Sequence, residues 1–171
     1  LKKLRADSPG AKRKEEASGI TLKPGILGAG HIAGKVGCAM EHLRGEIEPY
    51  AVASRDLCKA QDIAKRLVFA KAYGSYEELV SDPGVDVVYV ATLNSFHLEH
   101  TKLALEHGKH VLCEKPFALN EAQAGEMFEL ADEKGLFISE ALWTRFLPTM
   151  AEIRKIIASG EIGEVKTITG V

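Results

Sequence analysis

A glycine-rich segment near the start of the chain combines residue types that suit phosphate binding. Gly28, Gly30 and Ala33 form a Gly-x-Gly-x-x-Ala pattern directly after an apolar run and directly before a helical pattern. The first glycine allows a tight turn, the second lets the backbone approach a pyrophosphate, and a small third residue lets helix and strand pack closely. The helix that starts at His31 and Ile32 offers unpaired N–H groups to phosphate oxygens. The pattern therefore predicts a dinucleotide-binding turn.

Ser54 and Arg55 follow a second apolar run, at a position that decides cofactor choice. In a dinucleotide fold, the residue that ends this strand meets the adenosine ribose, and an acidic residue there accepts a bond from the 2′-hydroxyl of NAD. Ser54 and Arg55 are donors instead, and a guanidinium pairs with a phosphate through two charge-assisted hydrogen bonds. We therefore expect NADP, with NAD less favoured. The alternative is that Arg55 is a solvated loop residue. Asp56 is expected to cap the helix over 57–67.

The tripeptide Glu114-Lys115-Pro116 follows a strand expected over 110–113. Proline keeps Lys115 out of helical geometry and permits a cis bond. A lysine at the mouth of a nucleotide cleft could donate to a substrate oxygen or exchange its proton, since partial burial or a neighbouring cation lowers the pKa of an amine. From these three residues alone, a surface Lys-Pro turn with a Glu–Lys pair is an equally simple interpretation.

Further polar residues follow two other expected strands. The carboxyl ends of parallel strands gather at one edge of a sheet, where ligands bind, so these residues are candidates for the same site. They are Thr92, Asn94 and His97 after the strand over 85–90, and Trp143 and Arg145 after the sixth strand. A lone histidine is more often structural than a ligand contact. A tryptophan beside a cleft can belong to the core or form a platform for an apolar or sugar-like substrate.

Composition narrows the functional class. The 171 residues are 46% hydrophobic and 27% charged with a net charge of -2, which suits a soluble globular domain and gives no strong field for nucleic acid or a membrane surface. No run has the length of a transmembrane helix. The three cysteines, Cys38, Cys58 and Cys113, lack metal-ligand spacing, so we expect that they bind no metal. We expect them to be buried or half-buried thiols of a protein in a reducing compartment, with the cytoplasm as its location.

From Thr21 onward, apolar runs alternate with helical patterns, which predicts a doubly wound parallel α/β sheet of the Rossmann type with helices on both faces. Pro24 lacks an N–H and is tolerated only as the first residue of its strand. Strands are expected over 23–27, 50–53, 71–73, 85–90, 110–113, 136–138 and 165–169. Helices are expected over 32–43, 57–67, from Ser75, and over 96–106, 120–134 and 148–159.

Three regions follow from this alternation. Residues 1–20 form a basic segment without apolar periodicity, which predicts a disordered tail, with a transit peptide as the less favoured alternative. Residues 21–145 form the dinucleotide-binding domain. Residues 146–171 are expected to hold a connecting helix and the start of a truncated second domain.

Several motifs together resemble the glucose–fructose oxidoreductase/inositol dehydrogenase family (Gfo/Idh/MocA), from about Leu22 to the end of the chain. They are GILGAGHIA, VASRD, AYGSYEELVSDPGVDVVYVAT, the Asn94–His97 pair, GKHVLCEKP and EALWTRFLP. GKHVLCEKP is the most specific mark of the family. The last motif and Ser54-Arg55 are similar to the branch of dihydrodiol and NADP-dependent D-xylose dehydrogenases. Pro24 and Leu93 depart from the family pattern at positions that affect packing more than chemistry.

The resemblance implies a role for each matching position. By this resemblance, the pyrophosphate turn is formed by Gly28, Gly30 and Ala33, and the 2′-phosphate is bound by Ser54 and Arg55. The stretch of cofactor from adenosine to nicotinamide would be lined by Thr92, Asn94 and His97, and the nicotinamide ribose would be contacted by Glu114 and Lys115. Cofactor and substrate would be flanked by Trp143 and Arg145. Lys115 would be the catalytic lysine. Hydride would move between the nicotinamide and a hydroxyl-bearing carbon of a trans-dihydrodiol or an aldose such as D-xylose.

The resemblance also implies a second domain that supplies further proton-relay residues and joins subunits into a homodimer or homotetramer. The chain alone is then expected to bind NADP weakly and to turn over little or no substrate. Two other interpretations remain open. One is a non-catalytic NAD(P)-binding regulator of the same fold, which would not need the amine of Lys115. The other is an inactive gene fragment.

Overall fold

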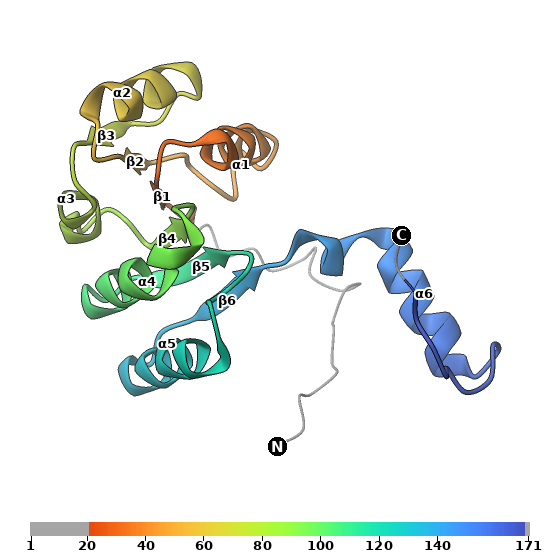
Figure 1. Ribbon diagram of the computed structural model, residues 1–171. Coiled ribbons are helices and arrows are strands. Elements are labelled where there is room, and N and C mark those ends of the chain that lie inside the picture. Colours follow the sequence, from red (N-terminus) through yellow and green to blue (C-terminus); the bar gives the residue numbers. More distant parts are fainter. Residues whose placement is uncertain (1–20, 170–171) are drawn as a thin grey trace.

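Six parallel strands form the centre of residues 21–169, the part of the chain that the computed structural model describes (Figure 1). Their order is β3-β2-β1-β4-β5-β6. The strands are β1 (Pro24–Leu27), β2 (Ala51–Ala53), β3 (Lys71–Tyr73), β4 (Val87–Val90), β5 (His110–Glu114) and β6 (Ile138–Ala141). The helices are α1 (His31–Glu41), α2 (Leu57–Arg66), α3 (Tyr76–Ser81), η1 (Asn94–Phe96), α4 (His97–Glu106), α5 (Glu121–Lys134), η2 (Trp143–Phe146) and α6 (Pro148–Ser159). The predicted parallel α/β sheet is confirmed, and the basic segment over 1–20 lies outside the described residues.

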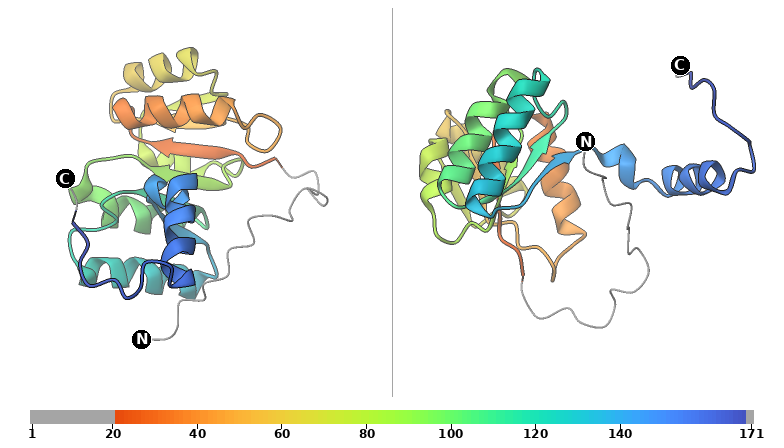
Figure 2. Two further views of the ribbon diagram at one scale, coloured as in Figure 1. Left: turned by 90° about the vertical axis from the view of Figure 1, so that its right-hand side faces the viewer. Right: turned by 90° about the horizontal axis from the view of Figure 1, so that it is seen from below.

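Helices cover both faces of the sheet, and each face has its own apolar core (Figure 2). α1 and α2 pack on one face around Ile26 and Val52. α3, α4 and α5 pack on the other face, where the core includes Leu27, Leu79 and Leu105. Neighbouring residues of a strand point to opposite faces, so Ile26 and Leu27 are both fully buried, one in each core. This explains the uninterrupted apolar sequence of β1.

A crevice lies at the carboxyl edge of the sheet, where the strand order changes direction. After β1 the chain places β2 and β3 on one side and then returns to place β4 on the other side. Ligands of open α/β sheets bind at this point. The turn after β1 is held there because the Gly28 N–H donates to the Ala53 carbonyl and the Ala91 N–H donates to the Leu27 carbonyl, both at 2.9 Å. β1 begins at Pro24, one residue later than the expected 23–27, so the proline occupies the strand position at which it is tolerated.

The helix boundaries follow local signals. The Asp56 carboxylate accepts from the Cys58 N–H at 3.1 Å, and Asn120 caps α5 by accepting from the Gln123 N–H at 2.9 Å. Gly135 and Gly160 end α5 and α6 with φ of 65° and 75°, values that favour glycine. The predicted cap at Asp56 is therefore confirmed.

Two predicted strands are wrong. The sixth strand is Ile138–Ala141 and not 136–138, because the Leu136 N–H still donates to the Ala131 carbonyl at the end of α5. Residues 165–169 form no strand, and Ile168 is 84% exposed. A strand needs the N–H and C=O groups of a neighbour, and no strand of the described region pairs with this segment.

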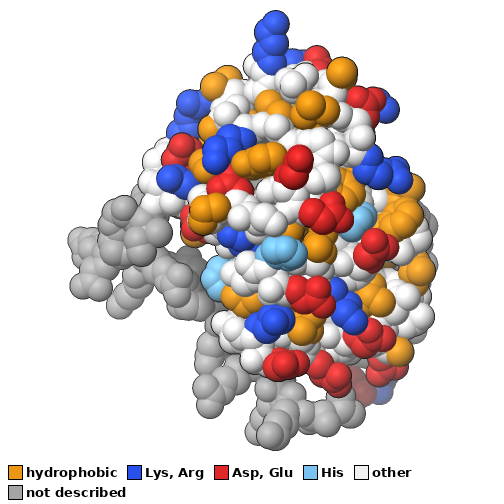
Figure 3. All heavy atoms as spheres, turned by 90° about the vertical axis from the view of Figure 1, so that its left-hand side faces the viewer, with side chains coloured by type: hydrophobic (Ala, Val, Ile, Leu, Met, Phe, Trp, Pro, Cys, Tyr) orange, Lys and Arg blue, Asp and Glu red, His pale blue; other side chains and the backbone are white. Residues whose placement is uncertain are grey.

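Charges on the surface are mixed in sign. On the face at the left of Figure 1, Lys and Arg side chains are interspersed with Asp and Glu side chains, without an extended region of one sign (Figure 3). Within residues 21–169, no helix combines the length and the apolar character that a membrane crossing requires. Cys113 is buried, but Cys38 and Cys58 are exposed because α1 and α2 present them to solvent. The expectation of buried or half-buried thiols is therefore wrong for these two.

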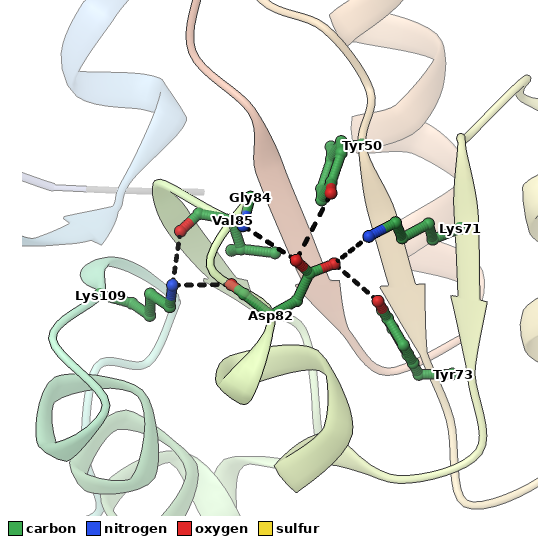
Figure 4. Close-up of polar contacts among 7 residues, drawn as sticks. All are labelled: Tyr50, Lys71, Tyr73, Asp82, Gly84, Val85 and Lys109. Carbon is green, nitrogen blue, oxygen red and sulfur yellow. Dashed lines mark hydrogen bonds and ion pairs between the residues drawn. The ribbon is translucent and has the colours of Figure 1, made fainter.

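A buried carboxylate joins β3, the end of α3 and the loop that enters β4 (Figure 4). Asp82 accepts from the Lys71 ammonium at 2.7 Å, the Tyr73 hydroxyl at 2.6 Å and the Gly84 N–H at 2.9 Å. The buried Lys109 ammonium donates to the Asp82 and Val85 carbonyls at 2.8 Å. Burial alone would raise the pKa of Asp82, but the three bonds to its carboxylate outweigh it and hold that pKa well below its usual value.

α6 lies clear of the sheet at the end of a linker that begins after β6 (Figures 1 and 2). None of its residues is buried, and Ile153 and Ile157 are about two-fifths exposed. The Arg154 guanidinium donates to the Arg145 carbonyl at 3.0 Å, which ties α6 to η2. Because α6 does not pack on the sheet, the sheet and η2 are the elements that position the candidate site.

Candidate functional site

The turn after β1 provides an open backbone cradle. Gly28 has a φ of +106°, and a Cβ there would lie 2.7 Å from the Ala91 carbonyl oxygen. A Cβ on Gly30 would meet nothing within 4 Å. Ala33 is fully buried and packs in the core with Ile26. The three positions thus meet the three requirements of the sequence pattern: a tight turn, free space and a close helix–strand contact.

The first turn of α1 points its amide end at this cradle. Gly30 is the N-cap, and no side chain within the described region caps the helix. His31 is exposed and Ile32 is half-buried at the same end. Uncapped amide N–H groups and the positive end of the helix dipole together bind anions. The cradle can therefore take a pyrophosphate.

Among the cavities at this helix end, two share Ile32. The first, the β2-side cavity, has a volume of about 710 Å³ and extends from Gly30 past the end of β2 to η1 and α4. The second, the β5-side cavity, has a volume of about 630 Å³ and extends from α1 past the ends of β5 and β6 to η2. A dinucleotide could lie across the cradle with one half in each cavity.

One wall of the β2-side cavity carries positive charge. It contains Ser54, Arg55 and Lys59. Ser54 is buried and its Oγ accepts from the Asp56 N–H at 3.2 Å, so its own hydroxyl proton can be donated elsewhere. Arg55 is exposed, and Lys59 lies one helical turn further on, with its Nζ 3.7 Å from an Asp56 carboxylate oxygen. The set offers a hydroxyl, a guanidinium and an ammonium to a phosphate.

Aromatic rings form the other wall of this cavity. Phe96 stacks on His100 with ring centroids 5.5 Å apart, and Tyr76 meets His100 edge-on at 4.6 Å. The Thr92 hydroxyl lies 2.9 Å from Nδ1 of His100. Burial lowers the pKa of His100, and the charge of Arg55 contributes in the same direction, although Glu99 and Glu77 oppose the shift. His100 therefore adds an uncharged ring at neutral pH.

The β5-side cavity brings together the polar residues that follow β5 and β6. Glu114, Lys115, Glu140 and Trp143 all contribute to it. The Tyr89 hydroxyl donates to Oε1 of Glu114 at 2.6 Å, and the Lys115 N–H donates to the other oxygen at 3.0 Å. Burial and the bond to Glu114 raise the pKa of Tyr89, so its hydroxyl remains a donor. The Glu114 carboxylate is thus held from two sides.

The side chain of Lys115 itself is exposed at the mouth of this cavity. The Lys115–Pro116 bond is cis. The Phe117 N–H donates to Oε1 of Glu140 at 3.1 Å, which fixes the other side of the turn. A flexible amine on a well-held turn can reach a substrate oxygen above the cavity. Trp143, 63% exposed, stands beside it.

Five predicted contact residues do not line either cavity: Gly28 and Ala33 shape the turn, and the other three are His97, Asn94 and Arg145. His97 is fully buried: its Nδ1 lies 2.9 Å from the Pro116 carbonyl and its Nε2 lies 3.3 Å from the Thr92 carbonyl. Packing places the ring beneath the site, so direct contact with a cofactor is not available to it, and it braces the two loops instead. Asn94 and Arg145 are exposed and line neither of the two cavities.

Sequence reasoning overlooked several residues that line the site. Lys59 stands four residues after Arg55 at a helix start, a spacing that could have indicated it. Tyr89 lines the β5-side cavity from a strand, and a strand sequence does not show which buried hydroxyl meets which carboxylate. His100, which the sequence did not single out, also lines the β2-side cavity. Among residues 21–169, no three His, Cys, Asp or Glu side chains are grouped to hold a metal ion.

Comparisons with known proteins agree with this geometry. Residues 22–142, more than half of the chain, match the oxidoreductase family with an NAD-binding Rossmann fold (Gfo/Idh/MocA). Trans-1,2-dihydrobenzene-1,2-diol dehydrogenase of Bos taurus is 42% identical over 150 residues, which are 87% of this chain and 45% of that enzyme. D-xylose 1-dehydrogenase (NADP(+)) of Hypocrea jecorina is 47% identical over 159 residues, with 85% of this chain and 40% of that enzyme covered.

Solved structures show the same fold. A 3-ketoreductase from Actinomadura kijaniata in complex with NADP and TDP-benzene has a TM-score of 0.79 at 29% identity, covering 86% of this chain and 45% of that one. An NAD binding oxidoreductase from Klebsiella pneumoniae has a TM-score of 0.73 at 36% identity, covering 84% and 40%. The chain spans less than half the length of the curated relatives it matches.

Proposed function

The chain belongs to the oxidoreductase family with an NAD-binding Rossmann fold, and on this premise we propose that it is the cofactor-binding part of an NADP-dependent dehydrogenase. The names of the relatives support a trans-dihydrodiol or an aldose such as D-xylose as substrate. The observation that carries the proposal is the open cradle at Gly30, which leads directly to the wall of Ser54, Arg55 and Lys59. Assembly into a homodimer or homotetramer and a cytoplasmic location belong to the same proposal.

The residues present fit NADP. Gly30 leaves room for a pyrophosphate in front of uncapped amide N–H groups, and the hydroxyl and cations of the wall suit a 2′-phosphate. An acidic residue that would accept from the 2′-hydroxyl of NAD is absent from position 54 and from position 55. Glu114, fixed by Tyr89, would accept from a hydroxyl of the nicotinamide ribose.

When bound, the nicotinamide would accept or supply the hydride. The chain's own residues then have four tasks. The cradle and the wall orient the cofactor so that its reactive half lies in the β5-side cavity. Glu114 and Glu140 hold the turn that carries Lys115. The Nζ of Lys115 would donate to the substrate oxygen and exchange the hydroxyl proton that must leave when the carbon is oxidised. Trp143 would cover an apolar or sugar-like substrate.

Titration of the chain with NADP and NAD tests the proposal. We expect Arg55→Ala to weaken NADP about ten- to hundred-fold, because a charge-assisted bond contributes about 1.5–3 kcal/mol, and to change NAD affinity little. Arg44→Ala is the matched control, since its guanidinium pairs with Glu41 at 3.7 Å and lines neither the β2-side cavity nor the other cavity at Gly30. Calorimetry measures both affinities.

Equal loss for both dinucleotides would remove the 2′-phosphate from Arg55. A folded chain that takes up neither dinucleotide would refute the cofactor-binding function itself.

A further inference from the structure

A groove of about 1120 Å³ runs between α1 and α2, which lie side by side on one face of the sheet (Figures 1 and 2). The two helices follow the parallel strands β1 and β2, so both begin at the carboxyl edge of the sheet. Their amide ends therefore lie at the same end of this α1–α2 groove, the end that Gly30 lines. The part of the groove beyond that end is not used by the proposed cofactor site.

Two thiols open into the α1–α2 groove. Cys38 and Cys58 both line it, and both are exposed. Cys58 is the second residue of α2 and lies at the amide end, whereas Cys38 follows His31 by seven residues, about 10 Å along α1. Exposed thiols in electropositive surroundings undergo disulfide exchange, and buried thiols are inert. The third cysteine, Cys113, is the inert comparison, because burial raises the pKa of its thiol to about 12.

The walls of the α1–α2 groove carry more basic than acidic side chains. The basic ones are His31, Lys35, Lys59 and Arg66, and the single acidic one is Asp62. Lys59 and Arg66 each have a carboxylate within 4 Å, but Lys35 forms no ion pair within residues 21–169. The amide N–H groups that begin α1 are also uncapped and can bind an anion. A small molecule with carboxylates is thus attracted to the end at which Cys58 lies.

We propose that the α1–α2 groove is a modification site, at which the Cys58 thiol exchanges with a small disulfide that carries carboxylates. The Cys58 sulfur attacks, as a thiolate, one sulfur of that disulfide. A new S–S bond joins Cys58 to one half of the ligand, and the ligand's own S–S bond breaks. Cys58 is oxidised, and the other half is reduced and leaves as a thiolate, which takes up the proton that Cys58 lost.

The adduct has a consequence for cofactor binding that rests on the proposed function. Gly30, His31 and Lys59 line both the α1–α2 groove and the β2-side cavity. Carboxylates attached to Cys58 would reach the N–H groups of α1 that the pyrophosphate is proposed to use. Modification of Cys58 and binding of NADP therefore exclude each other, whereas modification of Cys38, two turns along α1, leaves the cradle free.

Incubation of the folded chain with oxidised glutathione, the disulfide of an acidic tripeptide, tests the exchange. Mass spectrometry with peptide mapping is expected to find one glutathione per chain, on Cys58. Cys58→Ser should abolish this adduct, and the matched variant Cys38→Ser should retain it. Cys113 should react after unfolding in urea and not before. Circular dichroism shows that each variant is folded.

The charge of the groove is tested with cystamine, a disulfide that carries two ammonium groups. Oxidised glutathione should modify Cys58 at least about ten-fold faster relative to cystamine in the folded chain than in the urea-unfolded chain. Lys35→Gln should reduce this preference. Lys102→Gln, on α4 outside the groove, is the matched control and should leave it unchanged.

The outcomes separate the modification site from the proposed function. A folded chain that gains no glutathione at Cys58, or gains it as fast at Cys38, would overturn the site. The same preference in folded and unfolded chains would overturn the attraction of carboxylates. Saturating NADP should protect Cys58 and not Cys38, and NADP binding without protection would overturn the shared end of the groove. An adduct on Cys58 in a chain that binds neither NADP nor NAD would refute the proposed function alone.

Discussion

Gly28 and Gly30 are two residues apart, but their surroundings give them different tasks. Gly28 has a backbone conformation that side chains avoid, and its Cα faces the Ala91 carbonyl at close range. Gly30 has an extended backbone, with φ of −89° and ψ of −171°, that any residue adopts, and it faces open space. Of the two glycines, only the first is thus required by the fold.

We expect the two alanine variants to separate stability from binding. Gly28→Ala should destabilise the chain by about 2 kcal/mol or more, since a positive φ costs about 1–2 kcal/mol and the added Cβ meets a carbonyl. Gly30→Ala should cost at most about 1 kcal/mol of stability, because alanine is a poorer N-cap than glycine but its backbone conformation is allowed there, yet weaken NADP at least about ten-fold because the methyl group displaces the pyrophosphate. Urea unfolding and calorimetry measure the two effects. NADP binding unchanged by Gly30→Ala would show that no pyrophosphate crosses this glycine.

The partners of a side chain could be predicted where they lie in the same continuous segment, and could not be predicted where they lie in another segment. The glycine pattern and Ser54-Arg55 could be identified because the relevant neighbours are adjacent in the sequence. The brace formed by His97 depends on carbonyls at Thr92 and Pro116, which only the folded chain brings together.

Among the elements, the carboxylate of Asp82 is the main polar link between β3, α3 and the entry to β4. Its pKa is lower in the folded chain than in the unfolded chain, so the unfolded chain binds a proton first as the pH falls. The stabilisation is therefore complete above pH of about 4 and is lost progressively below it.

Asp82→Asn tests this link. We expect the variant to lose about 1–3 kcal/mol of unfolding free energy at pH 7, because bonds to a charged acceptor are replaced by weaker ones. The difference from wild type should shrink as the pH falls below about 4. Asp62→Asn, at an exposed ion pair of α2, is the control and should change stability by less than about 1 kcal/mol. A difference that stays constant between pH 7 and pH 3 would contradict the lowered pKa.

The element boundaries also show where sequence patterns were sufficient. Caps and glycine stops lie within one turn of the helix they end, so Asp56, Asn120, Gly135 and Gly160 were predictable. The apolar triplet 136–138 indicated a strand, but pairing with β5 shifts the strand to Ile138–Ala141. Residues 165–169 have strand-like composition but no neighbouring strand in the described region.

Across the whole molecule, the two cavities place the adenosine half and the nicotinamide half of the proposed cofactor on opposite sides of the α1 end. Trp143 is the single tryptophan of the chain and lines the β5-side cavity. We expect NADPH to quench its fluorescence, because reduced nicotinamide absorbs where tryptophan emits. 2′,5′-ADP, which lacks nicotinamide, should leave the emission unchanged, and Trp143→Phe should abolish the signal. Calorimetric binding of NADPH without quenching would place the nicotinamide elsewhere.

The sequence by itself determined the order of strands and helices and the glycine turn after β1, because each of these rests on neighbours within a few residues. The tertiary structure decided which distant side chains meet. It buried His97 beneath the turn that carries Lys115, joined Tyr89 to Glu114, and brought the rings of Tyr76, Phe96 and His100 together. Such contacts depend on how strands and helices pack in three dimensions, and the spacing of residues along one segment carries no record of that packing.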